Sequence, residues 1–122
     1  MLRKNLFSAE QIIAIVKDYR QAGLDPAEVA MMNFVQKIIR HAHTIKSEDV
    51  DDLRVFGLSD AEILDIVLAT TLRAFWSKTL DAIGAEPDDA YLALEPELRE
   101  ALSLGRPFMH QTTRKNLHQA SE

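Results

Sequence analysis

Helix start and stop signals constrain the fold of this chain more than any other feature of its sequence. Three times, a residue suited to a helix N-cap is followed three positions later by glutamine or glutamate. The pairs are Ser8 with Gln11, Asp25 with Glu28, and Ser59 with Glu62. This is the capping-box pattern, in which each side chain accepts a hydrogen bond from the other residue's backbone N–H. A glycine follows three of the four main helices, at Gly23, Gly57 and Gly84, and no segment has the two-residue period of a strand.

The signals predict an all-α fold of the helical-bundle type, with about four main helices and a short C-terminal helix. The first helix follows Ser8 and ends at Gly23, and the second follows Asp25 and fades around residues 41–43. Ser47 is expected to cap a short third helix that ends at Gly57. The core-facing residues of that helix are predicted to be Val50, Leu53 and Phe56.

The fourth helix is predicted to be the longest, running from its cap at Ser59 to about Ile83, with Gly84 after it. Pro96 to Leu104 is expected to form the short C-terminal helix. A chain of 122 residues suits one domain. We therefore expect a single helical domain over residues 1–105 and a polar, mobile tail over residues 106–122.

Composition narrows the possible functions. The chain has no cysteine, which excludes disulfides, thiolate chemistry and cysteine-ligated metals within it. Its 14 basic and 19 acidic residues give a formal net charge of −5, which argues against a nucleic-acid partner. The opening residues lack the apolar run of a signal peptide, and the longest apolar run, Ile66 to Leu72, is too short to span a membrane. A soluble, cytoplasmic protein without a membrane partner is therefore predicted.

Few residues offer chemistry. Glu28, His41 and His43 are weak catalytic candidates, as general acids or bases in a shared pocket. A metal site at the two histidines is not expected, because residues two apart at a helix end point about 200° apart. Glu28 and the capping serines already have structural roles. Neither a cofactor nor a metal is therefore predicted, and the residues identify no small-molecule substrate.

The fourth helix is apolar on nearly every side between Ile63 and Leu72. Such a helix is either central to its domain or buried on one face by another chain, and the two readings are compatible. The positive charge of Arg73 or Lys78 beside Trp76 would also suit a pocket for an anionic or redox-active ligand. An oligomer interface explains the same residues with fewer assumptions. A homo-oligomer is predicted. The predicted interface residues are Ile63, Ile66, Val67, Leu72, Phe75 and Trp76.

Three stretches, "AGLDPAEVAMMNFVQKIIR", "SEDVDDLRVFGLSDAEILDIV" and "RAFWSKTLDAIGAEPD", resemble the C-terminal half of peroxidase-related, alkylhydroperoxidase D-like proteins. These belong to the carboxymuconolactone decarboxylase-like superfamily, and the resemblance covers roughly residues 20–88. It implies an all-helical fold that forms homo-oligomers. In the redox members a C-x-x-C pair upstream of this half reduces peroxides. Relatives tend to carry the motif F-N-x-x-N-R in the segment where this chain has Arg73, Ala74, Ser77 and Lys78.

The leading hypothesis is an alkylhydroperoxidase D-like domain without redox cysteines. It would be a non-catalytic, degenerate or truncated member of an oxidoreductase family with antioxidant activity, and it would self-associate. The second hypothesis is a cysteine-free enzyme of the decarboxylase or lactone-processing kind, built on Glu28, His41 and His43. The third is a helical interaction module that binds itself or another protein through the face of the fourth helix from Ile63 to Trp76.

Overall fold

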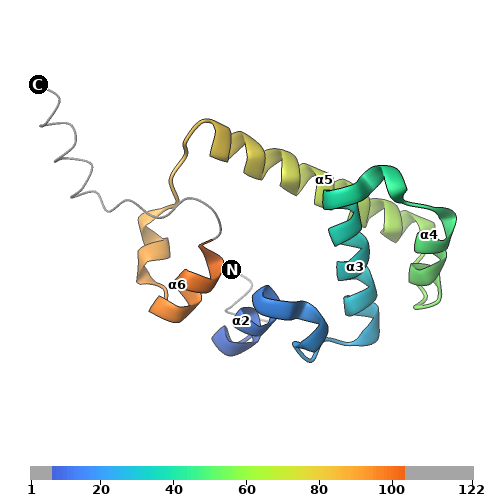
Figure 1. Ribbon diagram of the computed structural model, residues 1–122, viewed down its shortest axis with the longest axis horizontal. Coiled ribbons are helices and arrows are strands. Elements are labelled where there is room, and N and C mark those ends of the chain that lie inside the picture. Colours follow the sequence, from blue (N-terminus) through green and yellow to red (C-terminus); the bar gives the residue numbers. More distant parts are fainter. Residues whose placement is uncertain (1–6, 104–122) are drawn as a thin grey trace, which may run out of the picture. The chain divides into compact units, whose positions relative to one another are not determined.

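The computed structural model describes residues 7–103, apart from the side chain of Asp89. Every regular element in that part of the chain is a helix (Figure 1). The α-helices are α2 (Ala9–Asp18), α3 (Pro26–His41), α4 (Ser47–Arg54), α5 (Asp60–Ala82) and α6 (Pro96–Leu102), and the 3₁₀-helices are η1 (Tyr19–Gln21), η2 (Ala42–Thr44) and η3 (Asp89–Ala93). The predicted all-α fold, with four main helices and a short last one, is confirmed. The predicted tail, residues 106–122, lies outside the described residues.

All three predicted capping boxes form. At the start of α5, the Ser59 N–H donates to Glu62 Oε2 at 2.8 Å and the Glu62 N–H donates to Ser59 Oγ at 3.3 Å. The Ser8–Gln11 and Asp25–Glu28 pairs make the same reciprocal bonds. These bonds satisfy backbone N–H groups that have no partner within a helix, and therefore fix where α2, α3 and α5 begin.

The first helix ends earlier than predicted. The α2 helix stops at Asp18, whose backbone is extended, with φ −159° and ψ 97°. The Asp18 carboxylate accepts a hydrogen bond from the Arg20 N–H at 3.1 Å and so starts the separate turn η1. A short acidic side chain competes with the helix for nearby N–H groups, and here the competition breaks the helix before Gly23.

The prediction for the third helix is correct in part. Leu53 is buried and Val50 packs against the core, as expected. Ser47 is not the cap, because α4 begins at Ser47 and the N-cap position is Lys46, whose N–H donates to Asp49 Oδ2 at 2.8 Å. The core-facing prediction for Phe56 is also wrong. Because α4 ends at Arg54, Phe56 lies in the following turn and is 45% exposed.

Contacts divide the chain into two compact units. The first is residues 17–85, and the second combines the described residues before 17 with those after 85. In the first unit α3 packs against both α4 and α5. Its core consists of Phe34, Ile38, Leu53 and Ile63, with one or two residues from each of the three helices. Burial of these apolar side chains holds the three helices together and positions the surfaces described below.

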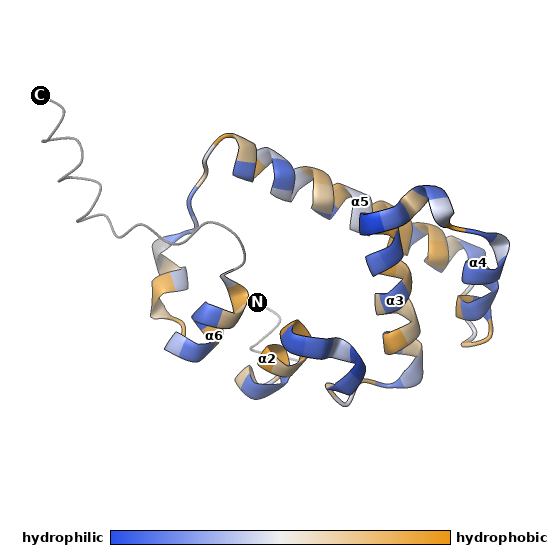
Figure 2. Ribbon diagram, in the orientation of Figure 1, coloured by the Kyte–Doolittle hydropathy of each residue, from blue (hydrophilic) through white to orange (hydrophobic). Residues whose placement is uncertain are grey.

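The α5 helix has 23 residues, and its C-terminal half extends beyond α3 and α4 (Figure 1). Apolar residues continue into this half, interspersed with polar ones (Figure 2). Only Ile63 and Thr70 of the helix are buried. The Thr70 hydroxyl donates to the Ile66 carbonyl oxygen at 2.6 Å, so a polar group on the buried side finds its partner within its own helix.

The second unit contains the start of α2 together with η3 and α6. Leu98 of α6 is buried, and Tyr91 is part of an apolar pocket of about 580 Å³. The other apolar residues lining that pocket include Phe7, Ile12, Ile15, Val16, Leu94 and Leu102. Burial raises the pKa of the Tyr91 phenol above its ordinary value, since the ionised form would lose its hydration there.

Candidate functional site

The three weak catalytic candidates do not meet within one chain. The Glu28 carboxylate accepts the Asp25 N–H at 3.0 Å, in the capping box that starts α3. His41 is the last residue of that 16-residue helix, and His43 lies in η2 just beyond it. Thirteen residues at 1.5 Å per residue separate Glu28 from His41 by about 20 Å. The Glu28 carboxylate is therefore far from both imidazoles.

The two histidines lie closer together than the sequence predicted. The backbone leaves the α-helical conformation at His41, with φ −146° and ψ 44°, before the turn η2. This break brings the two imidazole rings edge to face with their centroids 6.5 Å apart, instead of on opposite sides of a continuing helix. Both side chains are exposed. Within residues 7–103 no group of three His, Cys, Asp or Glu side chains is placed to hold a metal ion.

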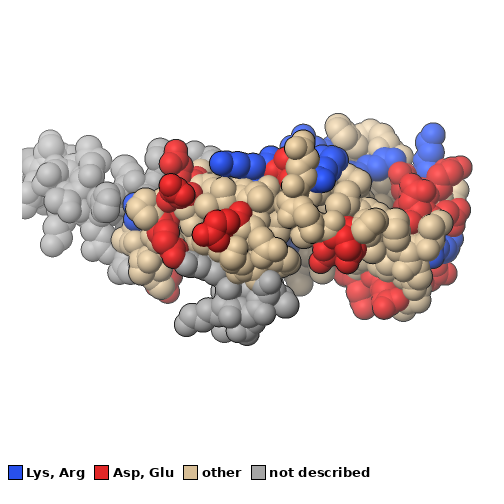
Figure 3. Space-filling view, turned by 90° about the horizontal axis from the view of Figure 1, so that it is seen from below, with Lys and Arg blue, Asp and Glu red and all other residues tan. Residues whose placement is uncertain are grey.

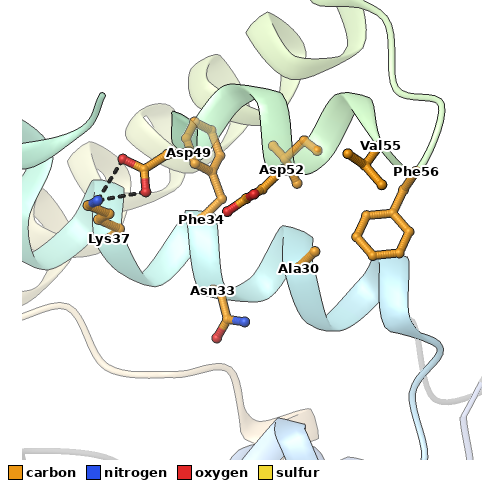
Figure 4. Close-up of a pocket in the computed structure, with 9 residues that line it drawn as sticks. Ala30, Asn33, Phe34, Lys37, Asp49, Asp52, Val55 and Phe56 are labelled. Atoms are coloured by element: carbon orange, nitrogen blue, oxygen red, sulfur yellow. Dashed lines mark hydrogen bonds and ion pairs between the residues drawn. The ribbon is translucent and has the colours of Figure 1, made fainter. Parts of the chain in front are cut away.

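A pocket of about 430 Å³ lies between α3 and α4 (Figure 4). From α3 it is lined by Ala30, Asn33, Phe34 and Lys37, and from α4 and the following turn by Asp49, Asp52, Leu53, Val55 and Phe56. Its polar end is formed by Lys37 and Asp49, whose side chains point toward each other (Figure 4). The Asp52 carboxylate extends from α4 toward α3, and Phe56 closes the other end.

The ion pair at the polar end is structural. Lys37 Nζ lies 2.7 and 2.6 Å from the two carboxylate oxygens of Asp49, and the side chains are only 32% and 24% exposed. The hydrogen bond from Lys37 lowers the pKa of Asp49, and the bond from the Lys46 N–H lowers it further. An aspartate held ionised in this way is a poor proton donor near neutral pH. It instead fixes the start of α4 against α3.

Acidic side chains gather around this end of the molecule. The α4 helix carries Glu48, Asp49, Asp51 and Asp52 within its eight residues. Figure 3 shows acidic side chains over the end formed by α4 and the start of α5. Arg54 compensates part of this charge, bridging Asp51 at 2.6 Å and Asp60 at 2.7 Å. Sequence reasoning missed the Lys37–Asp49 pair, because twelve residues separate the partners and only packing brings them together.

The predicted interface residues fall into two groups. Ile63 is 5% exposed and belongs to the core, and Ile66 and Val67 pack against that core. Their side chains serve the contacts of α5 with α3 and α4. Leu72, Phe75 and Trp76, in contrast, are all more than half exposed. The Arg73 guanidinium donates to the Ser77 hydroxyl on the same helix.

Other exposed apolar residues of α5 and its C-cap lie on the same face as Leu72, Phe75 and Trp76. We define the α5 stripe as Leu64, Leu68, Leu72, Phe75, Trp76 and Ile83, each between 55% and 72% exposed. At 100° per residue they lie within an arc of about 120°, roughly opposite Ile63 and Thr70. The spacing of Leu64, Leu68, Leu72 and Phe75 is that of one helical face. Sequence reasoning did not separate this face from the second apolar face, which includes Ile63, Ile66 and Val67.

No family model matches the chain, and comparison with curated proteins and with solved structures gives no significant match. Among residues 7–103, no helix combines the length and the apolar character that crossing a membrane requires.

Proposed function

We propose that this chain is an alkylhydroperoxidase D-like helical domain without redox cysteines, and that it works by self-association through the α5 stripe and not by catalysis. The family assignment is supported by the resemblance over residues 20–88. The non-catalytic role is supported by the absence of cysteine from the sequence and by the separation of Glu28 from His41. That separation leaves the decarboxylase or lactone-type hypothesis without a shared pocket in one chain.

The observation that carries self-association is the exposure of the α5 stripe. An aromatic side chain such as Phe75 or Trp76 has roughly 150–250 Å² of surface, and the four aliphatic side chains of the stripe have somewhat less each. All six are more than half exposed, so together they present on the order of 600 Å². This is at the upper end of the roughly 300–600 Å² typical of the largest patch on a monomer. It also approaches the roughly 800 Å² that each partner contributes to a specific interface. Removing this surface from water favours association.

Analytical ultracentrifugation of the purified chain, from about 1 to 200 μM, tests this proposal. We expect the wild-type protein to form a dimer or larger oligomer, and the double variant Leu68→Glu, Leu72→Glu to be monomeric. The matched control is Ile39→Glu, because Ile39 is an exposed apolar residue of α3, 49% accessible and outside the stripe. Circular dichroism of each variant reports whether its helices are retained. A wild-type chain that stays monomeric at the highest concentration would refute self-association.

A peroxidase assay tests the absence of redox catalysis separately. Thiol-dependent peroxide reduction needs a nucleophilic thiolate, and the sequence contains no cysteine. We expect no turnover of hydrogen peroxide or an alkyl hydroperoxide above the buffer rate in the presence of dithiothreitol. Enzyme-dependent turnover that follows protein concentration would overturn the non-catalytic role and leave the oligomer measurement unaffected.

A further inference from the structure

Charges of opposite sign are separated along α5. Asp60, Glu62 and Asp65 lie in its first two turns. Arg73 and Lys78 lie in its C-terminal half, where the acidic Asp81 in the last turn is the one exception. The acids in the first turn suit the positive end of the helix macrodipole, whereas the last turn carries no base.

Asp60, Glu62, Arg73 and Lys78 flank the α5 stripe, whereas the exposed Asp65 falls within its arc, between Leu72 and Trp76. On a helical wheel Asp60 and Lys78 fall on one border of the stripe, about 40° from Leu64. Glu62 and Arg73 fall beyond the other border, about 40–60° from Trp76. Each border therefore carries an acid near the start of the helix and a base toward its end. Charges in these positions face a partner helix that packs on the stripe, as the flanking charges of coiled coils do.

The direction of the partner helix decides whether the flanking charges attract. In a parallel pair of α5 helices, the acidic starts lie side by side and so do the basic C-terminal halves. In an antiparallel pair, the acidic start of one helix lies beside the basic half of the other. Only charges within about 8–10 Å interact strongly at physiological salt, whereas a 23-residue helix is about 35 Å long. The local sign of the charge therefore sets the preferred direction.

We propose that the partner of the α5 stripe is a second copy of this chain, with the two α5 helices packed antiparallel about a two-fold axis near Ala69. This inference rests on the proposed self-association. The antiparallel arrangement pairs Asp60 and Glu62 with Lys78 and Arg73 of the second copy. It also opposes the two helix macrodipoles, which a parallel arrangement aligns. The stripe is self-complementary, as a two-fold interface requires.

The chain contains no cysteine, so a single introduced cysteine carries a single spin label. Ala61→Cys, Ala69→Cys and Ala82→Cys place a label near the start, the middle and the end of α5, at residues that are all exposed. Double electron–electron resonance on each variant then measures the distance between the two labels of a dimer. Sedimentation of each labelled protein, compared with wild type, establishes that the label has left association intact.

An antiparallel dimer gives long distances at both ends and a short one in the middle. At 1.5 Å per residue from the axis, we expect roughly 25–40 Å at residues 61 and 82 and a clearly shorter distance at residue 69. Short, similar distances at all three positions would show a parallel dimer, refuting this inference while self-association stands. A wild-type protein that sediments as a monomer would refute the proposed function itself. A long distance at all three positions would show that α5 does not form the interface.

Discussion

Lys37 of α3 and Asp49 of α4 form the ion pair that joins these two helices, with Nζ 2.6 Å from Oδ2. The same carboxylate accepts the Lys46 N–H at 2.8 Å. One side chain therefore satisfies a free N–H at the start of α4 and ties that start to its neighbour. Because both side chains are about two-thirds or more removed from water, the pair is screened less than an ion pair on the open surface.

This pair predicts a pH-dependent stability. The pKa of Asp49 is below its ordinary value in the folded protein, first because of Lys37 and then because of the Lys46 N–H. Its stabilising contribution is therefore complete above the unfolded pKa of about 3.9 and is lost as the pH falls through the folded pKa. We expect Asp49→Asn to melt at a lower temperature than wild type at pH 7. The difference should shrink as the pH falls below about 4.

Thermal unfolding followed by circular dichroism at a series of pH values measures this difference. Glu48→Gln is the matched control, because Glu48 lies beside Asp49 in the first turn of α4 and its substitution removes the same charge. We expect a smaller loss for Glu48→Gln at pH 7. If Asp49→Asn were as stable as wild type at pH 7, the ion pair would contribute nothing to the fold.

The capping boxes predict different effects at two serines. Ser59 accepts the Glu62 N–H, so Ser59→Ala should destabilise the protein by about 1 kcal/mol. Ser47 follows the N-cap position of α4, and the N–H at that start is accepted by the Asp49 carboxylate instead. Ser47→Ala should therefore change the free energy of unfolding by much less. Urea unfolding of the two variants and the wild type makes the comparison. Equal losses at the two positions would contradict the assigned caps.

Core packing predicts a large loss of stability on substituting one residue near the end of α4 and almost none on substituting another. Leu53 is 1% exposed and contributes to the core, whereas Val55 is 81% exposed. Leu53→Ala removes buried methyl groups and leaves a cavity, which should cost about 2–5 kcal/mol. Val55→Ala should stay within about 0.5 kcal/mol of wild type. Denaturant midpoints report both values. A mild Leu53→Ala phenotype would show that α4 does not depend on this contact.

Gly57 ends the turn after α4 with φ +86°, a conformation that other residues adopt at a cost. A Cβ at this position would meet no atom within 4 Å. Gly57→Ala should therefore destabilise through backbone strain alone, by roughly 1–2 kcal/mol. Urea unfolding measures the loss, and an unchanged crystal structure around the turn would identify strain as the cause. A variant as stable as wild type would show that the turn adopts another conformation.

Local chemistry in the sequence determined the helices and most of their ends. The Ser8, Asp25 and Ser59 capping boxes involve residues three apart, so their hydrogen bonds could be read from sequence alone. The same reasoning failed at Asp18, whose own carboxylate accepts the Arg20 N–H, and at the start of α4, where the Asp49 carboxylate accepts the Lys46 N–H and Ser47 is not the cap. Such competition between nearby acceptors depends on small differences in backbone geometry, which residue spacing does not reveal.

Only the tertiary structure decided which apolar face of α5 is used by its own chain. Ile63 and Leu72 look alike in a helix that is apolar nearly all round, yet Ile63 is buried against α3 and α4 and Leu72 is exposed. Helical periodicity defines the faces of a helix, but burial requires a neighbour at the right place. Likewise, Lys37 and Asp49 become partners only because α3 and α4 pack together. Packing between helices far apart along the chain supplies that information, and no local pattern contains it.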